Sequence, residues 1–303
     1  MRNGIVRSPL FYVGDKYKLV EEIKSHFPTD IERFIEPFVG GGSVFLNVDA
    51  KSYLLNDIDS YVIDIHRMLC SYAGREDDFF RDFYSIIDKY GLSNSYEKDV
   101  IPQELKKEFP KTHIAKYNKQ SYSVLKNDYN RKYKDDVLML YVLLIYGFNR
   151  MLRFNKSGDF NIPVGDVDFN KNTRNALVDY FNLLQHKQVQ WFSQDFREFF
   201  KTIDFQQNDL VYLDPPYLIT SSEYNKLWNE ETERDLLAFL DCLNAENVMF
   251  AVSNVTHYRG RTNDIFINWS QQYNVFPIKS NYISFNDNTQ KKFNEVLVTN
   301  YKR

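Results

Sequence analysis

Four residues near the start of the last third of the chain combine properties that suit chemistry on an amino group. The strand-forming run "VYLD" (211–214) leads directly into Pro215, Pro216 and Tyr217. Each proline fixes its own φ, lacks an N–H donor and restricts the residue before it to extended backbone. The sequence therefore predicts a rigid corner in which the Asp214 carboxylate and the Pro215 carbonyl are neighbouring acceptors.

Such a corner suits a planar substrate that carries an exocyclic amino group. The two amino hydrogens need two acceptors, which the Asp214 side chain and the Pro215 carbonyl would supply. Bonding both hydrogens would draw the nitrogen lone pair out of the ring and toward an electrophile, while the Tyr217 ring stacks on the substrate. The alternative is a turn that only ends the strand.

A second group of residues is typical of a nucleotide site. Three glycines (40–42) stand between a strand pattern at 33–39 and an expected helix that begins at 44–48. Glycine allows a tight turn close to a ligand, and a helix N-terminus offers N–H donors. Asp57 follows the next strand pattern, where a carboxylate can accept both hydroxyls of a ribose. The alternatives are a turn without a ligand and, for Asp57, a helix N-cap.

The glycine spacing is not that of a dinucleotide fold or a P-loop, so an adenosyl group with an amino-acid tail fits this site as well. Upstream, Lys16 follows Tyr12 and Gly14 and precedes a helical pattern. Its ammonium would contact a ligand carboxylate or a nucleic-acid phosphate. The alternative is an ordinary surface lysine.

The elements that must position these residues alternate between strand and helix at both ends of the chain. The expected strands are "RFIEPFV", "SYLLND", "VQWF", "DLVYLD", "NVMFAVS" and "NEVLVTNY". This alternation predicts a mostly parallel sheet covered by helices on both faces. Residues 75–174 differ, because an apolar helix pattern at 136–152 is followed by a turn-rich stretch that predicts a β-hairpin or loop. We therefore expect an α/β domain formed by 1–74 and 175–303, with a mostly helical insertion at 75–174.

Charge separates the insertion from the rest of the chain. The 303 residues carry a net charge of −3, yet residues 111–134 hold seven basic side chains against Asp128 alone. Such asymmetry favours a face that meets phosphates, the alternative being a solvated helix face. No apolar run is long enough for a membrane span, and two cysteines without a CxxC pair predict no structural zinc site.

The motifs "EPFVGGGSVFLN", "LNDID" and "LDPPY", in this order, resemble those of S-adenosylmethionine-dependent DNA adenine-N6 methyltransferases of the Dam type, the alpha group or D12 class. "DPPYLITSSEYNKLW", "DLLAFLDCLN" and "SNV" look most similar to the Dam enzymes of T-even bacteriophages. "YGFNRMLRFNKSGDFNIPVG" resembles the target-recognition hairpin of the family, and "YVGDKYKLVEEIKSHFP" its opening motif. The resemblance covers nearly the whole chain. It implies a Rossmann-like class I methyltransferase sheet with an inserted target-recognition domain.

The resemblance also implies roles for individual residues. Asp214, Pro215, Pro216 and Tyr217 would receive the target adenine. The cofactor S-adenosyl-L-methionine would be held by Tyr12, Lys16, Phe38, Gly40, Gly42, Ser43, Asp57, Ile58 and Phe196, with Asp214 beside it. Double-stranded DNA would be contacted by Lys126, Arg131, Lys132, Asn149, Arg150, Arg153, Asn155 and Pro163.

The implied reaction is methyl transfer to N6 of an adenine flipped out of the duplex, in GATC or a related GA-containing site, without a metal. The implied location is the cytoplasm of a bacterial cell or of a phage-infected bacterium, without association with a membrane. The enzyme would act on DNA as a monomer or a weak dimer. Orphan, phage and restriction–modification roles all fit the sequence. A cognate restriction endonuclease would be the genetic partner in the last of these.

One departure from the family concerns specificity. Dam enzymes that read GATC carry a basic residue shortly after the hairpin proline, where this chain has "PVGDVDF" with Asp166 and Asp168. Arginine is the usual bidentate reader of guanine, so its loss would relax or alter recognition at one position by ~1–3 kcal/mol. Arg153 favours a GA-containing core.

Two rival functions use the same kind of fold. A methyltransferase of RNA or of a protein amide also needs two acceptors around an amino group, but such sites resemble "NPPY", and a basic insertion would be superfluous. A non-catalytic nucleotide-sensing or DNA-binding module predicts a damaged motif, and "DPPY" is intact.

Overall fold

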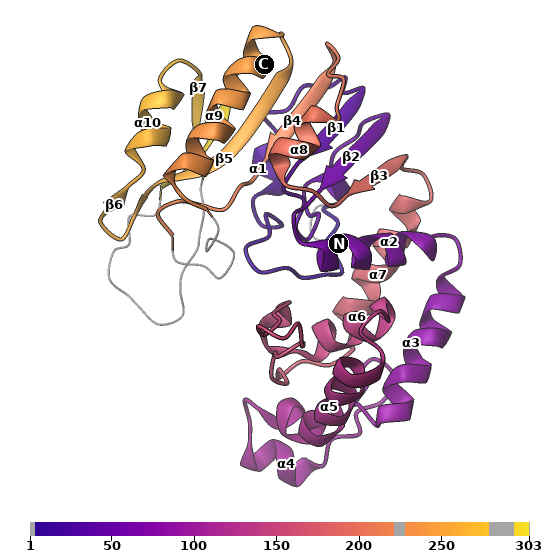
Figure 1. Cartoon of the computed structure of the whole chain (residues 1–303). Helices are drawn as coiled ribbons and strands as arrows, with labels where there is room; N and C mark the ends of the chain where they lie inside the picture. Colours follow the sequence, from indigo (N-terminus) through magenta and orange to yellow (C-terminus); the bar gives the residue numbers. More distant parts are fainter. Residues whose placement is uncertain (1–3, 221–227, 279–293, 303) are drawn as a thin grey trace. The chain divides into compact units, whose positions relative to one another are not determined.

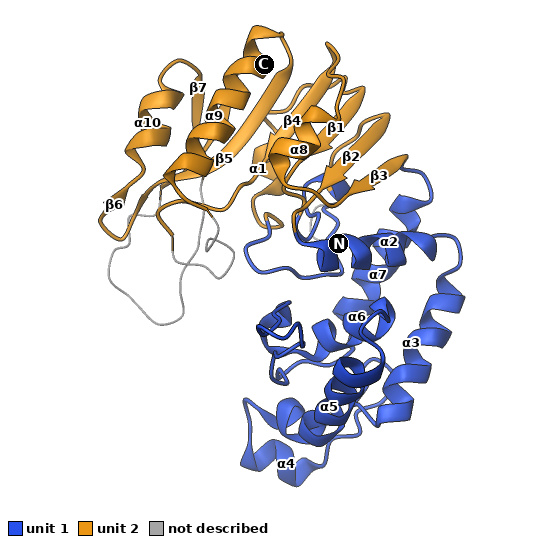
Figure 2. Ribbon diagram, in the orientation of Figure 1, with its two compact units in different colours: residues 1–15, 40–46, 59–187 blue, residues 16–39, 47–58, 188–303 orange. Residues whose placement is uncertain are grey.

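The structure is a computed structural model that describes residues 4–220, 228–278 and 294–302 (Figure 1). The chain forms two compact units, each built from separate segments (Figure 2). Unit 1 consists of residues 1–15, 40–46 and 59–187, and unit 2 consists of residues 16–39, 47–58 and 188–303.

Unit 2 is built on one sheet, in which the described strands follow the order β3-β2-β1-β4-β5-β8-β7, with β6 paired to β5. The strands are β1 (Arg33–Glu36), β2 (Ser52–Asn56), β3 (Val189–Phe192), β4 (Asp209–Leu213), β5 (Met249–Tyr258), β6 (Arg261–Thr262), β7 (Asn274–Ile278) and β8 (Asn294–Thr299). Strands β1 to β5 pair in parallel, whereas β8 pairs antiparallel with both β5 and β7. The predicted mostly parallel α/β sheet is therefore confirmed.

Alternation of side chains along the strands gives the sheet two apolar faces. Ile35 and Val211 belong to a buried cluster that includes side chains of α8 and α9. Their neighbours Phe34 and Tyr212 point the other way and stack on each other, with Phe27 packed against both. A strand whose two faces are both buried reads as a continuous apolar run, as "DLVYL" does.

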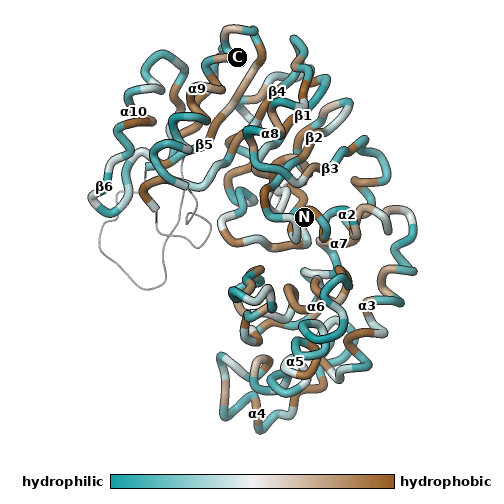
Figure 3. The backbone as a smooth tube through the Cα atoms, viewed as in Figure 1, coloured by the Kyte–Doolittle hydropathy of each residue, from teal (hydrophilic) through white to brown (hydrophobic). Residues whose placement is uncertain are grey.

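The helices of unit 2 are α1 (Val20–Lys24), α8 (Phe196–Lys201), α9 (Glu230–Ala245) and α10 (Asp264–Ser270). Helix α9 begins where its sequence predicts. Asn229 accepts from the Thr232 N–H, and three glutamates in the first turn favour the positive end of the helix dipole. Its leucines face the sheet, and hydropathy along the backbone can be followed in Figure 3.

Unit 1 is helical, and its centre is the apolar helix predicted from the sequence. Its helices are α2 (Ser60–Ser71), α3 (Glu76–Tyr90), α4 (Gln103–Glu108), α5 (His113–Lys132), α6 (Val137–Tyr146), the 3-10 turn η2 (Phe148–Arg150) and α7 (Lys171–Leu184). Every residue of α6 from Met139 to Tyr146 is buried, and α2, α3 and α5 pack around it. No helix in the described part of the chain is long and apolar enough to cross a membrane.

Two local predictions differ from the structure. The helix expected at 44–48 is only a 3-10 turn, η1 (Phe45–Asn47), because the Tyr53 hydroxyl donates to the Val48 carbonyl and accepts from the Ala50 N–H, which holds the chain in a loop. The apolar helix predicted at 136–152 ends at Tyr146, because the backbone of Gly147 is extended. The stretch after it, predicted as a hairpin or loop, holds two isolated antiparallel bridges, Phe154 to Phe160 and Gly147 to Val164. The functional division at 75–174 stays a prediction, since the compact units have other bounds.

The buried ion pair between Arg33 and Asp209 fixes the register of β1 and β4. Asp209 is fully buried and accepts from Arg33 Nε at 2.8 Å and Nη2 at 2.6 Å. We expect Asp209→Asn to lower the free energy of unfolding by about 3 kcal/mol, because it leaves a partly buried guanidinium without its anion. Urea denaturation checks this. Glu32→Gln, which breaks the exposed Lys51–Glu32 pair, is the control and should cost less than about 1 kcal/mol. Equal losses of unfolding free energy in the two variants would contradict a special role for the Arg33–Asp209 pair.

Candidate active site at the carboxyl edge of the sheet

Parallel pairing brings four strand ends of unit 2 to one edge of the sheet. Because β1, β2, β3 and β4 run in the same direction, the residues after each strand lie along their common carboxyl edge (Figure 1). In open α/β sheets this edge is where ligands bind. Phe38, Asp57, Phe196 and Asp214, four of the predicted site residues, all follow these strands.

Asp214 is held by two donors at this edge. Lys16 Nζ lies 2.6 Å from Oδ2, and the Tyr217 hydroxyl donates to Oδ1 at 2.8 Å. Lys16 is only 4% exposed, so it is a buried ion-pair partner rather than the surface lysine of the alternative reading. Pro215, the next residue in the chain, is buried. Within unit 2 the structure thus brings together three of the predicted residues, Asp214, Tyr217 and Lys16.

The sequence analysis missed a second carboxylate in this cluster. Glu295 of β8 is 2% exposed, and its Oε1 lies 3.1 Å from the Tyr217 hydroxyl and 3.6 Å from Lys16 Nζ. Burial raises the pKa of Glu295, an effect that the Lys16 ammonium opposes. Burial and the two neighbouring carboxylates raise the pKa of Tyr217 well above its ordinary value. No sequence motif marks Glu295, which lies in an ordinary strand pattern.

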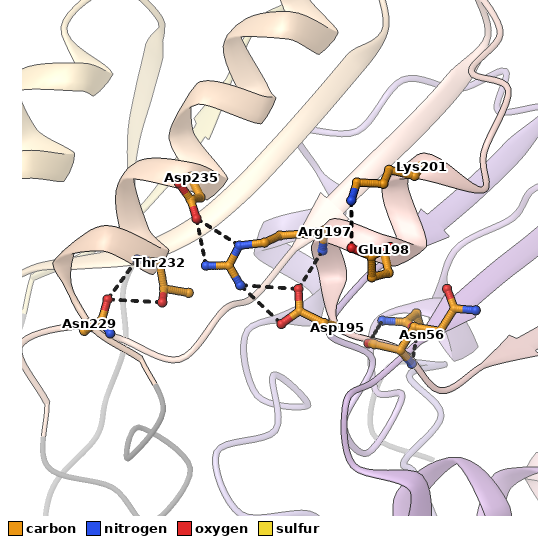
Figure 4. A network of polar contacts seen from close by, with 9 residues as sticks. Asn56, Asp195, Arg197, Glu198, Lys201, Asn229, Thr232 and Asp235 are labelled. Atoms are coloured by element: carbon orange, nitrogen blue, oxygen red, sulfur yellow. Dashed lines mark hydrogen bonds and ion pairs between the residues drawn. The ribbon is translucent and has the colours of Figure 1, made fainter.

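An asparagine ties three strand ends together. Asn56 at the end of β2 donates to the carbonyls of Pro37 and Gln194, both at 3.0 Å, and accepts from the Gln194 N–H at 3.0 Å. Figure 4 shows it beside a second network, in which Arg197 bridges Asp195 of the α8 N-cap to Asp235 of α9. These contacts fix the loops that carry Phe38 and the residues after β3.

The aromatic residues expected to hold an adenine ring form a cluster of their own. Phe38 lies 5.5 Å from Phe196 and 5.7 Å from Trp228, measured between ring centroids. Phe196 is 4% exposed, so Phe38 is the more accessible ring of the two. Ile58, by contrast, is 61% exposed, which is unusual for a large apolar side chain next to a strand end.

Asp57 does not cap the following helix. Asp59 takes that role, because its side chain accepts from the Tyr61 N–H at 3.0 Å. The helix-cap alternative for Asp57 is therefore wrong. Its carboxylate follows β2 at the carboxyl edge, as the nucleotide reading predicts.

In unit 1 the glycine turn is crowded on the side of Tyr12. A Cβ on Gly41 would lie 2.6 Å from Tyr12 Cβ, closer than real Cβ contacts, and Gly40 and Gly42 have φ of +46° and +77°. Packing against Tyr12 therefore requires glycine at position 41, and the positive φ values favour glycine at positions 40 and 42. Ser43, directly after the turn, is buried. The predicted residues Tyr12, Gly40, Gly42 and Ser43 thus belong to one tightly packed loop region.

A buried histidine that the sequence analysis missed holds this turn. His66 Nε2 lies 2.9 Å from the Gly40 carbonyl and Nδ1 lies 3.0 Å from the Tyr180 hydroxyl. A carbonyl only accepts, so Nε2 carries the hydrogen and Nδ1 accepts from Tyr180. Burial lowers the pKa of His66 from 6.5 to about 4. The ring is therefore neutral, and it supports the turn by donating to the Gly40 carbonyl.

The residues predicted to contact DNA divide into exposed and buried groups. Exposed are Arg131, Lys132, Asn149, Arg153, Asn155 and Pro163. Lys126 is half-buried, with Nζ 3.3 Å from the Ile162 carbonyl. Arg150 is 9% exposed, because its guanidinium packs 3.8 Å from the Phe11 ring centroid and donates to Thr173 Oγ1; burial lowers its pKa to about 10. Lys126 and Arg150 thus already have protein partners.

The turn-rich stretch has an ordered backbone of its own. Asn155 accepts from the Ser157 and Asp159 N–H groups, and Arg153 Nε donates to Asn161 Oδ1. The two acidic residues that depart from the family pattern also have structural partners. Asp166 accepts from the Ala115 N–H in the first turn of α5.

Asp168 is buried and accepts from both the Ser93 and Ser95 hydroxyls and from the Ser95 N–H. Burial raises its pKa, and these donors oppose that rise. Asp168 therefore holds a loop rather than facing a ligand. Among the described residues, no group of three or more His, Cys, Asp or Glu side chains is placed to hold a metal ion.

Residues 12–284 match the family described as D12 class N6 adenine-specific DNA methyltransferase. This chain belongs to that family. It is 35% identical over 99% of its length to the type II methyltransferase M.FokI of Planomicrobium okeanokoites, and 34% identical over 98% to the modification methylase StsI of Streptococcus sanguinis. It spans 43% of the length of each of these relatives. It is also 27% identical to the DNA adenine methylase of Escherichia coli K12, over 96% of this chain and 94% of that protein.

The D12 membership confirms the resemblance stated from the motifs. The narrower likeness to T-even phage enzymes stays a prediction. Residues 221–227 of the "DPPYLITSSEYNKLW" motif lie outside the described residues.

His66 gives this fold a defined acid sensitivity. A histidine whose pKa is lower in the folded state adds stability above its ordinary pKa and loses it as pH falls toward the folded value. Between pH 7 and pH 4, we expect the free energy of unfolding of the wild type to fall by roughly 2–3 kcal/mol more than that of His66→Gln. Urea titrations at both pH values check this. Parallel losses in the two proteins would contradict a buried, neutral His66.

Proposed function

We propose that this protein transfers a methyl group from S-adenosyl-L-methionine to the N6 amino group of an adenine in double-stranded DNA. The observation that carries the proposal is the Asp214 carboxylate at the carboxyl edge of β4, followed by two prolines and hydrogen-bonded to Tyr217. Family membership supports the reaction class.

The residues proposed for the cofactor fit its chemistry. The glycine turn, against which Tyr12 packs, carries no Cβ atoms, so a ligand could approach its main chain closely. Asp57 offers a carboxylate to a ribose, and the exposed Ile58 beside it offers an apolar surface to a purine. Phe38 and Phe196 would support the ligand from the neighbouring loops. When bound, the cofactor supplies an activated methyl group on a sulfonium.

On the adenine side, catalysis consists mostly of positioning and polarisation. Asp214 and the Pro215 carbonyl would accept the two N6 hydrogens and direct the nitrogen lone pair toward the methyl group. The amino group of a paired adenine is stacked and hydrogen-bonded, so the nucleotide has to leave the duplex at a cost of a few kcal/mol. Stacking on Tyr217 would offset ~1–3 kcal/mol of this cost.

DNA contact is assigned to the insertion at 75–174. Lysines and arginines on α5 and in the segment after α6 supply positive charge, and Arg131, Lys132 and Arg153 are exposed for phosphate or base contact. GATC or a related GA-containing site remains the proposed target. Asp166 and Asp168 support a departure from strict GATC reading, because both carboxylates hold protein groups where the family pattern has a base-reading cation.

A methyltransferase of RNA or of a protein amide is the second candidate, and the basic α5 disfavours it. Two relatives are named as a type II methyltransferase and a modification methylase, which favours a restriction–modification role with a cognate endonuclease in a bacterial cytoplasm. The chain spans less than half of those relatives, so this role is part of the proposal.

The direct test is transfer of labelled methyl from S-adenosylmethionine to unmethylated plasmid DNA, followed by sequencing that maps N6-methyladenine. Label in a defined GA-containing site supports the proposal and reads out the specificity. Label in RNA or protein, and none in DNA, would favour the second candidate instead.

Asp214→Asn keeps the shape of the side chain but gives it a donor where N6 needs an acceptor. We expect the rate of methyl transfer to fall by at least about a hundredfold, with cofactor affinity changed far less. Single-turnover transfer and calorimetric cofactor binding measure the two quantities. Asp195→Asn, which changes a partly exposed N-cap carboxylate on α8, is the control. A variant at Asp214 with near-wild-type turnover would rule out this mechanism.

Arg131→Gln tests the assignment of α5 to DNA. If Arg131 contacts one phosphate, the slope of log affinity against log salt should become shallower by about 1, with weaker binding to every DNA sequence. Fluorescence anisotropy over a salt series measures both. Arg234→Gln removes an exposed arginine of α9 in unit 2 and should leave the slope unchanged.

A further inference from the structure

The Lys16 ammonium occupies the two contacts that the proposed function gives to the target base. Its Nζ lies 2.6 Å from Asp214 Oδ2 and 5.1 Å from the centroid of the Tyr217 ring. An adenine in this site would place its amino group on the same carboxylate and its ring on the same aromatic face. The other carboxylate oxygen, Oδ1, already accepts from the Tyr217 hydroxyl.

Lys16 therefore has to leave Oδ2 before the base can bind there. With 4% of its side chain exposed, the ammonium cannot simply move into water, and a buried cation without an anion costs several kcal/mol. It needs a second buried carboxylate within a short movement. Glu295 supplies one, because its Oε1 lies 3.6 Å from the same Nζ and its side chain is 1% exposed.

Hydrogen counting supports an ammonium that is shared between the two acids. The Tyr217 hydroxyl has one hydrogen but faces both Asp214 Oδ1 and Glu295 Oε1, so it cannot satisfy both carboxylates. Glu295 Oε2 is buried and has no hydrogen-bond partner among the residues that the structure describes. An arriving ammonium would satisfy this carboxylate and favour its ionised form.

On the basis of the proposed function, we propose that Lys16 is a placeholder for the target base and that Glu295 is the carboxylate that receives Lys16 when the base enters. In the free protein the ammonium neutralises Asp214. As the adenine amino group takes its place on Oδ2, the ammonium closes the gap to Glu295. Asp214 then keeps two hydrogen-bond donors, the amino group and the Tyr217 hydroxyl, and the ammonium keeps a carboxylate partner. Glu295 is thus a positioning residue, acting through Lys16.

Glu295→Gln tests this directly, since it keeps the shape of the side chain and removes the anion. A 2-aminopurine placed next to the target adenine reports extrusion of that adenine by a rise in fluorescence, because the probe loses its stacking neighbour. We expect a smaller rise in the variant, and a kcat/KM for DNA lower by about tenfold to a hundredfold, the effect of one lost charge-assisted bond. Cofactor affinity should stay within about twofold, which shows that the variant is folded. Wild-type fluorescence and kcat/KM in the variant would overturn the proposal.

Glu233→Gln is the matched control. Glu233 is a fully buried glutamate of the same unit whose carboxylate accepts from Trp228, Asn254 and Asn263. Its variant reports what neutralising any buried carboxylate does, and it should keep the fluorescence rise. A loss as large as that in Glu295→Gln would overturn a specific role for Glu295.

The double variant separates the placeholder from a general effect on the site. Lys16→Met removes the ammonium, so adding Glu295→Gln should change the 2-aminopurine signal no further. An equal loss in the presence and absence of Lys16 would show that Glu295 acts independently of it and would overturn the proposal. Failure of the wild type to methylate DNA adenine would instead overturn the proposed function itself.

Discussion

The buried ion pair between Lys16 and Asp214 joins residues that are 198 positions apart in the chain. A carboxylate at the end of a buried strand is stable only with partners, and here they come from the segment before α1 and the turn after β4, while Glu295 at the start of β8 contacts both of these partners. Strand order brings these places together, because β4 and β8 flank β5. The candidate site is therefore a consequence of sheet topology as much as of the "DPPY" motif.

Much of the sheet could be predicted because strands buried on both faces leave a strong local signal. The rigid corner at 214–217 was predictable for the same kind of reason, since proline restricts the backbone whatever surrounds it. His66, Asn56 and Glu295 carry no such signal. Each is a single polar residue in an apolar pattern, and its role depends on a partner that is distant in sequence. The helix expected after the glycines does not form because of a residue outside that motif, Tyr53, whose hydroxyl donates to the Val48 carbonyl five positions earlier.

Exposure divides the predicted DNA contacts in a way that charge alone does not show. A guanidinium packed on an aromatic ring and an ammonium next to a carbonyl use their charge inside the protein, as Arg150 and Lys126 do. Asp166 and Asp168 show the converse, because acidic residues in a segment that the family uses for recognition serve the backbone of their own unit. To assign DNA specificity from a motif in this segment, it is therefore necessary to know which protein group each charged side chain already contacts.

The interleaving of the two units has a consequence for synthesis of the chain. Strand β1 lies between β2 and β4, and more than 150 residues separate β1 from β4 along the chain. During translation, one edge of β1 therefore stays open while all of the unit 1 helices emerge. Sheets with such non-local pairing form slowly, and open strand edges favour aggregation. Early folding of the unit 1 helices around α6 would shorten the effective loop between β1 and β4 and so speed the pairing of these strands.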